Sequence, residues 1–323
     1  MGTDKRILEG LFGDRLAWGV PMRDFTTLRI GGPAQAMAVA RTQEELIEIV
    51  RIARGEGIPF LLLGGGSNLL VADEGVASLA IKNEVGGVWR RGDLVVARAG
   101  ARLQDLVDFT LGSALAGLER MTGIPGTVGG AVYGNAGAYG QTISDHLEEV
   151  ICFDGSNLRS LGREDCQFAY RSSVFKRNGF IVLEVCLRLA PADPSALIAE
   201  SREIRRQRLL KYPVGLRCPG SFFMNVLAEQ LPAETLALIP PDKVIYGKVP
   251  AGYLLEQAGA KGQVRGDIEI SQVNANLFIN RGDGTAADFI LLATEQARNV
   301  KQKYGIELTP EVQFIDLPPL QLS

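Results

Sequence analysis

The sequence predicts an α+β protein with more than one domain. Strand-like and helix-like segments alternate up to about residue 83, strand-like runs and a glycine-rich stretch follow to about residue 190, and the last third ends in a long helical pattern. The 323 residues are enough to bury two or three cores. The 34 basic and 37 acidic residues nearly balance, so we expect no general attraction to nucleic acid or to anionic membranes.

The first region contains one helix signal and one strand signal. Thr42 to Glu45 reads as a capping box, and Leu46, Val50 and Ala53 follow at helical spacing. The apolar run at 60–63 is typical of a buried strand, and it leads directly into five small or polar residues at 64–68.

The later elements are predicted by the same patterns. We expect strands at 94–99, 150–153, 180–185 and 311–315, and helices at 103–114, 196–210 and 285–304. In the last helix one apolar face carries Phe289, Ala293, Ala297, Val300 and Tyr304.

Several classes of protein are disfavoured by what the sequence lacks. His146 is the single histidine, so a histidine-rich metal site is excluded and we expect no metal. Cys152, Cys166, Cys186 and Cys218 form no CxxC pair, which favours four free, mostly buried thiols. No run reaches the roughly 20 apolar residues of a membrane span, and residues 1–6 do not resemble a secretory signal. We therefore expect a cytoplasmic protein that does not insert into membranes.

Two glycine clusters are the strongest candidates for ligand binding. The turn at 64–68 (Gly-Gly-Gly-Ser-Asn) would let backbone N–H groups approach a phosphate, although it also fits an ordinary tight turn. It has neither the G-x-G-x-x-G pattern of a dinucleotide fold nor the lysine of a P-loop. The second cluster, at 123–140, is either backbone lying against a large flat ligand or a tightly packed loop.

An ordered series of motifs resembles the UDP-N-acetylenolpyruvoylglucosamine reductases. It covers about residues 20–316 and comprises Thr26–Ala34, Gly64–Leu70, Gly123–Ala131, Tyr170–Lys176, Gly220–Asn225, Gly252–Gly259 and Leu308–Val312. The short segment between Lys176 and Phe180 resembles the second type of the family, which lacks an extra substrate-covering loop. One glycine cluster is weak evidence, whereas the ordered series is specific.

The resemblance implies the fold and the domains. It implies a two-lobed FAD-binding domain of the vanillyl-alcohol-oxidase type and a smaller α+β substrate-binding domain. We assign 1–83 to the first lobe, 84–195 to the second and 196–308 to the substrate domain, and we expect the C-terminal strand within 309–323 to return to the second lobe. The cofactor contacts implied are Gly64, Gly65, Gly66, Ser67, Asn68, Gly123, Ile124, Pro125, Gly126, Thr127, Gly129, Gly130, Asn135 and Gly137.

The resemblance also implies a reaction. FAD, bound non-covalently, would pass a hydride from NADPH to the enolpyruvyl group of a UDP-sugar, giving UDP-N-acetylmuramate for peptidoglycan. Arg171 would hold the substrate carboxylate, because a guanidinium binds two oxygens at once. Glu311 would lie at the same oxygens, and we expect it to be protonated there, since a second carboxylate would repel the developing enolate. Ser221 would donate the proton to the carbanion.

Substrate contacts and departures from the family pattern complete the prediction. Tyr170, Lys176, Lys211 and Asn225 are implied substrate-binding residues, although Lys211 is equally compatible with a solvent-exposed position. Where the family commonly has Pro-Ser-Ala-Gly-Ser and then a lysine, this chain has Pro219 before Gly220 and Met224 at the lysine position. Asn274 stands where histidine is common.

We expect the protein to be a monomer.

Two alternatives remain: an FAD-dependent oxidase of the same fold, or a non-catalytic relative that binds FAD or a UDP-sugar. Many oxidases of that fold attach flavin covalently to histidine or cysteine. We predict that acid-denatured protein releases all its yellow colour into the supernatant. Colour retained by the precipitated chain would instead favour the oxidase.

Overall fold

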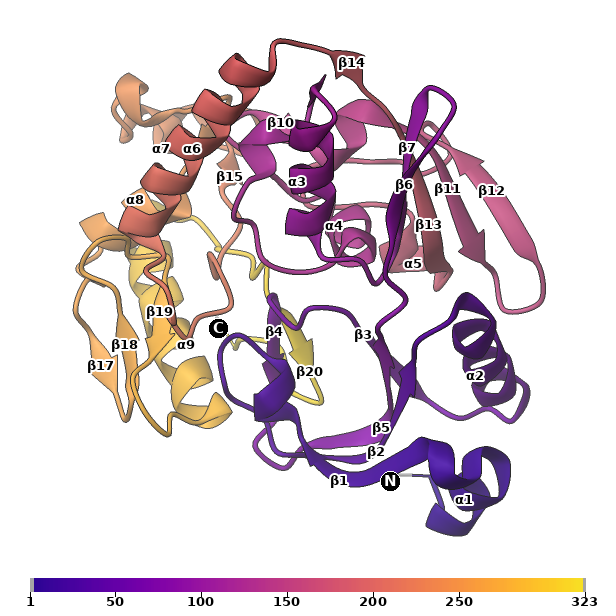
Figure 1. Ribbon diagram of the computed structural model, residues 1–323. Helices are drawn as coiled ribbons and strands as arrows, with labels where there is room; N and C mark the ends of the chain where they lie inside the picture. The colour runs from indigo at the N-terminus through magenta and orange to yellow at the C-terminus, as the bar shows by residue number, and fades with distance from the viewer. Residues whose placement is uncertain (1–2, 322–323) are drawn as a thin grey trace. The chain divides into compact units, whose positions relative to one another are not determined.

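The computed structural model describes residues 3–321, and they form two compact units. Unit 1 consists of Met1–Val20, Ala34–Gly65 and Ala77–Pro213, and unit 2 of Pro21–Pro33, Gly66–Val76 and Val214–Ser323. Each unit is described by itself below. Figure 1 shows the ribbon, and short 3₁₀ turns connect several of its elements.

Unit 1 contains the helix predicted after Thr42, the helix predicted at 103–114 and most of the strands. In chain order its elements are α1 (Lys5–Phe12), β1 (Leu16–Pro21), β2 (Pro33–Ala40), α2 (Gln43–Gly55), β3 (Phe60–Leu63), β5 (Val76–Asn83), β6 (Val88–Arg91), β7 (Leu94–Arg98), α3 (Leu103–Gly112), β8 (Leu115–Ala116), α4 (Val128–Gly134), β9 (Gly137–Ala138), β10 (Gln141–Thr142), β11 (Leu147–Phe153), β12 (Leu158–Gly162), α5 (Phe175–Asn178), β13 (Ile181–Arg188), β14 (Ala190–Pro191) and α6 (Pro194–Lys211).

Two sheets organise unit 1. The first has the strand order β1-β2-β5-β3, and β3 runs parallel to β5 with Leu63 opposite Lys82. The second is antiparallel, with the order β12-β11-β13-β7-β6. The helices α3 and α4 contact this second sheet through β6, β7 and β13, as Figure 1 shows. A separate buried cluster, which includes Ile49 and Ile81, lies between α2 and the first sheet.

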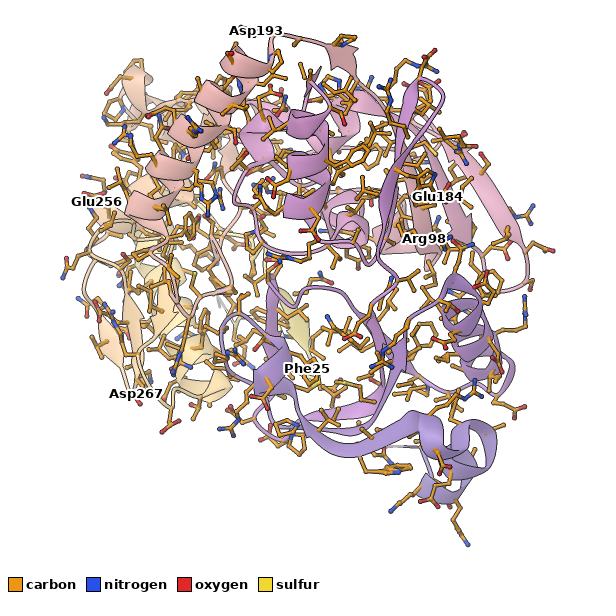
Figure 2. The ribbon with its side chains drawn as sticks, in the orientation of Figure 1. Phe25, Arg98, Glu184, Asp193, Glu256 and Asp267 are labelled. Carbon is orange, nitrogen blue, oxygen red and sulfur yellow. The ribbon has the colours of Figure 1, made fainter. Side chains whose placement is uncertain are left out.

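Helix α2 begins at the predicted capping box. Thr42 Oγ1 accepts a hydrogen bond from Glu45 N (3.2 Å), and the Glu45 carboxylate accepts one in return from Thr42 N (3.2 Å). Hydrogen bonds from the backbone N–H of Arg41 and that of Thr42 hold the pKa of the Glu45 carboxyl below its usual value. The side chain of Gln43 accepts a hydrogen bond from Arg98 (3.2 Å), which lies opposite Glu184 on the second sheet (Figure 2). The α2 segment is therefore joined to both sheets of unit 1.

Unit 2 is built around the long C-terminal helix. Its elements are β4 (Leu69–Val71), β15 (Val226–Leu227), α7 (Ala233–Ala237), β16 (Lys248–Val249), α8 (Ala251–Gln257), β17 (Val264–Arg265), β18 (Ile268–Ile270), β19 (Phe278–Asn280), α9 (Ala286–Tyr304) and β20 (Gln313–Ile315). The face of α9 that carries Phe289, Ala293 and Tyr304 is buried, as predicted. Phe222 and Phe278 pack on Phe289 with ring centroids 5.0 and 5.2 Å away, so a group of aromatic rings lies within this core.

The segments that make up the two units do not coincide with the domain bounds predicted from the sequence. Residues 21–33 and 66–76 leave the first region and belong to unit 2. Strand β20 pairs in parallel with β4, and not with a strand of residues 84–195 as expected. Since β4 is fully buried, its backbone groups need a hydrogen-bonding partner, and β20 supplies it. The assignment of two lobes and a substrate domain to these segments stays a prediction.

All four cysteines are free and buried, as the sequence predicts. Burial raises the pKa of Cys152 to about 11 and that of Cys166 to about 12. Thiols with such pKa values are almost entirely protonated at neutral pH, so neither is suited to nucleophilic chemistry.

A carboxylate far away in sequence caps α9. Asp73 accepts hydrogen bonds from the backbone N–H groups of Ala286 (2.8 Å) and Ala287 (3.1 Å), two of the donors that a helix leaves unpaired at its start. We predict that Asp73→Ala lowers the free energy of unfolding by about 1–2 kcal/mol in urea titrations. Asp14→Ala, at an exposed position of unit 1, should change it by less than about 0.5 kcal/mol. Equal effects of the two substitutions would contradict the capping role.

Candidate active site

The two glycine clusters meet within unit 1. A β-carbon at position 64 would lie 2.6 Å from Thr127 Oγ1, and one at position 65 would lie 2.5 Å from the Gly126 Cα atom. Distances this short are not tolerated between real side chains and backbone, so only glycine allows the two segments to approach. The turn after β3 and the loop before α4 therefore form one surface of bare backbone, in which Gly65 is exposed.

The remaining residues of the first turn belong to unit 2. Gly66 has φ of 62°, and a β-carbon there would overlap the backbone carbonyl of Phe25, which is labelled in Figure 2. The Gly66 carbonyl accepts a hydrogen bond from Thr27 N (3.1 Å), so the Thr26–Ala34 motif supports the turn. Asn68 donates from its side-chain amide to the Glu311 carbonyl oxygen (3.0 Å). This predicted cofactor residue therefore also fixes the backbone of a predicted catalytic residue.

Arg171 is held against the second glycine cluster in unit 1. Its Nη1 donates to the Gly137 carbonyl (3.1 Å), and its guanidinium lies 5.5 Å from the centre of the Tyr170 ring. The backbone at Arg171 has φ of 54°, a left-handed conformation that costs an arginine energy and is typical of functional positions. Lys176 donates to the Arg171 carbonyl (2.8 Å), so three predicted site residues come together here.

The same segment is tied to Asn135. This residue caps α4 in a left-handed conformation with φ of 43°, and its amide donates to the Ala169 carbonyl (3.0 Å). Its Oδ1 atom is buried and has no hydrogen-bond partner among residues 3–321. A buried acceptor of this kind costs free energy unless a donor reaches it, so Asn135 fits a predicted ligand contact.

A second buried polar atom lies beside the same cluster. Arg208 of α6 points its Nε towards Gly123, at 3.2 Å from where a β-carbon of residue 123 would be. This Nε has no hydrogen-bond partner among the described residues, and burial lowers the pKa of the guanidinium. The Tyr212 ring lies 5.1 Å from the guanidinium carbon. A buried cation and a buried acceptor along one glycine-rich segment are the features that a polar, flat cofactor such as FAD would satisfy.

Ser221 and Glu311 are brought together by backbone pairing in unit 2. Glu311 N donates to the Phe222 carbonyl (2.8 Å), Met224 N donates to the Thr309 carbonyl (2.9 Å), and Phe223 forms a β-bridge with Pro310. On its other side Ser221 forms a β-bridge with Leu277. The serine and the glutamate are thus placed on neighbouring backbone segments about 90 residues apart in sequence, while Arg171 belongs to unit 1.

One buried amide holds this arrangement. Asn276, 3% exposed, accepts from Phe223 N (2.8 Å) and donates to Phe223 O (2.8 Å). Asn274 accepts a hydrogen bond from Asn276 N (3.0 Å), and a β-carbon at Gly252 would lie 2.6 Å from the Asn274 side-chain oxygen. Asn274, which stands where histidine is common in the family, therefore stabilises a local turn that orients Asn276.

The other predicted substrate residues are placed less distinctively. Asn225 accepts a hydrogen bond from Ala251 N at the start of α8 (3.1 Å), so part of its role is structural. Lys211 is the last residue of α6 and is exposed. Neither position is tested as a substrate contact by these observations.

Three residues with evident roles were not found from the sequence. Arg208 lies in the helix predicted at 196–210, and Asn276 lies two residues after Asn274, but neither position carried a signal of its role. Lys82 donates to the Gly64 carbonyl, and its only signal in the sequence is a lysine directly after the apolar run Leu79 to Ile81. Among residues 3–321 no group of three His, Cys, Asp or Glu side chains could hold a metal, and no helix is long and apolar enough to cross a membrane.

The Asn276 contact generates a testable prediction. Asn276→Ala leaves the Phe223 N–H and carbonyl buried without a partner, and we expect a loss of about 2–4 kcal/mol in the free energy of unfolding measured in urea. Asn299→Ala removes only a weak 3.4 Å hydrogen bond to Gln296 and should change stability by less than about 0.5 kcal/mol. A loss below about 0.5 kcal/mol for Asn276→Ala would show that the amide does not hold the Ser221 segment.

Comparisons with known proteins cover residues of both units. A family model described as an FAD binding domain matches residues 34–156, and one described as UDP-N-acetylenolpyruvoylglucosamine reductase, C-terminal domain, matches residues 212–315. The reductase of that name from Solibacter usitatus is 39% identical over 95% of this chain and 99% of its own length. The one from Rubrobacter xylanophilus is 40% identical over 92% and 94%.

A solved structure shows the same similarity to the reductases. The crystal structure of UDP-N-acetylenolpyruvylglucosamine reductase from Thermus caldophilus has a TM-score of 0.74 and 32% identity, over 93% of this chain and 98% of that chain. The predicted α+β fold class with an FAD-binding domain and a second domain is confirmed by these matches. With identity of this degree along almost its whole length, the chain belongs to the UDP-N-acetylenolpyruvoylglucosamine reductase family.

Proposed function

We propose that this protein reduces the carbon–carbon double bond of UDP-N-acetylglucosamine enolpyruvate to give UDP-N-acetylmuramate in peptidoglycan precursor synthesis. The observation that carries the proposal is the backbone pairing of the Ser221 segment with the Glu311 segment. It gives a proton donor and a carboxyl group fixed positions, which the reduction of an unsaturated carboxylate requires. NADPH as the hydride donor, non-covalent binding of FAD, the monomeric state and the cytoplasmic location are also part of this proposal.

The residues available to hold FAD are those of the bare backbone surface in unit 1. Gly64, Gly65 and Gly126 leave room for close approach, while Asn135 and Arg208 offer a buried acceptor and a buried donor. Ser67, Ile124, Pro125, Thr127, Gly129, Gly130 and Gly137 are the further cofactor contacts in this proposal. When bound, FAD supplies a two-electron carrier between NADPH and the double bond.

Arg171 is the group proposed to bind the substrate carboxylate. A guanidinium can donate two parallel hydrogen bonds to a carboxylate and stabilises the enolate charge that develops on it. The hydrogen bond from Arg171 Nη1 to the Gly137 carbonyl and the left-handed backbone at Arg171 orient this side chain before substrate binds. Tyr170 and Lys176, both in contact with Arg171, are proposed substrate contacts, as are Lys211 and Asn225.

Ser221 and Glu311 complete the proposed chemistry. Ser221 donates its hydroxyl proton to the carbanion at the carbon next to the carboxylate. This carbanion is a strong enough base to accept the proton. Glu311, entering protonated, donates a hydrogen bond to the same enolate oxygens as Arg171. Glu311→Gln should therefore retain more activity than Glu311→Ala, because the amide keeps a neutral donor at this position.

The half-reactions of Ser221→Ala test the proposal. We expect reduction of the bound flavin by NADPH to stay near the wild-type rate in stopped-flow absorbance, because the hydroxyl has no part in it. Reoxidation by UDP-N-acetylglucosamine enolpyruvate should slow by about 100- to 10,000-fold, the usual contribution of a general acid.

Ser271→Ala is the matched control. Ser271 is a buried serine of the same unit whose hydroxyl accepts a hydrogen bond from Val273 N (3.1 Å). Both half-reactions should keep their wild-type rates in this variant. If Ser221→Ala slowed both half-reactions equally, the assignment of the proton donor would be wrong.

A further inference from the structure

Lys82 is a charged residue in an unusual place. It lies one residue before the end of β5, which is an interior strand of the first sheet with β2 and β3 as neighbours. The residues before it, Leu79 to Ile81, are buried, and Lys82 itself is half-buried. Lysine is rarely placed in such a position without a partner, because burying an ammonium group costs free energy.

The partners of the ammonium group leave it under-satisfied. It donates to the Gly64 carbonyl, whereas an ammonium carries three N–H donors. Among residues 3–321 no carboxylate forms an ion pair with it, and Glu84 is paired with Arg41 at 3.6 Å. Burial lowers the pKa of Lys82, and the Glu84 charge opposes that effect only in part. Among the described residues, therefore, no carboxylate neutralises the Lys82 ammonium group through an ion pair.

The position of Lys82 shows where such an anion would come from. Strands β3 and β5 are parallel with Leu63 opposite Lys82, so the carboxyl ends of both strands lie at one edge of the sheet. Ligands of α/β sheets bind at that edge. Directly after Leu63 comes the turn in which Gly64 packs against the Thr127 side chain and Gly65 against the Gly126 backbone. The backbone of a glycine turn beside a half-buried cation forms a site suited to phosphate.

We propose that Lys82 binds the pyrophosphate of a dinucleotide at the Gly64–Gly65 turn, and that this dinucleotide is the FAD of the proposed reaction. The inference rests on the proposed function, since that function requires FAD. The pyrophosphate of NADPH has the same chemistry and is the other possible source. Lys82 would also hold the Gly64 carbonyl in place, so that one side chain both shapes the turn and neutralises its ligand.

Lys82→Met tests this inference because it keeps the length of the side chain and removes its charge. We expect the dissociation constant of FAD for the apoprotein, measured by calorimetric titration, to rise by about 10- to 100-fold, the value of a hydrogen bond to a charged group. Lys82→Arg keeps the cation and should restore most of the affinity. ADP, used as a probe for the pyrophosphate site, should raise the thermal midpoint of the wild-type apoprotein more than that of Lys82→Met.

Lys303→Met is the control. Lys303 of α9 also donates to a backbone carbonyl, that of Gln257, but at an exposed site in unit 2, and its replacement should leave the FAD dissociation constant unchanged. If Lys82→Met lowered only the thermal midpoint of the apoprotein and left FAD affinity intact, Lys82 would be a structural contact and the inference would be wrong. An increase confined to the KM for NADPH would assign the site to that nucleotide instead. Wild-type apoprotein that binds no FAD would overturn the proposed function itself.

Discussion

The close approach of two backbone segments in unit 1 is the constraint on which the site depends. Gly64 and Gly65, after β3, lie against Gly126 and Thr127, and any side chain at the first two positions would collide with the second segment. This contact joins the end of the first sheet to the start of α4, and with it the glycine-rich loop to which Arg171 is bound. Because Gly64 and Gly65 have no β-carbons, the two segments can touch, and their backbone forms a surface that a flat cofactor can cover.

The second half of the site depends on hydrogen bonding rather than on small residues. Ser221 and Glu311 are fixed because their neighbours pair through the backbone, and the Asn276 amide closes that pairing with two buried hydrogen bonds. Asn68 extends the network from the first turn to the Glu311 carbonyl. Rigid placement of this kind matters for catalysis, because a proton donor works only when it is held within reach of the reacting carbon. The departures at positions 224 and 274 leave this network intact.

Local signals allowed much of the fold to be predicted, and long-range pairing accounts for most of what was not. The capping box at Thr42, the strand at 60–63 and the buried face of α9 are encoded by neighbouring residues, and all three were predicted correctly. The pairing of β20 with β4 was not predicted, because it depends on which distant strand has unpaired backbone groups. Lys82 and Asn276 were missed for the same reason, since their partners lie 18 and 53 residues away. The roles proposed for Arg171, Ser221 and Glu311 rest on an ordered series of motifs, which periodicity alone could not provide.

The most direct test of this account is the visible spectrum of the purified protein through one catalytic cycle without oxygen. The account predicts a yellow protein that is bleached by NADPH and regains its colour when UDP-N-acetylglucosamine enolpyruvate is added, with one UDP-N-acetylmuramate formed for each flavin reoxidised. A protein that is bleached by NADPH but recovers its colour only with oxygen would contradict it.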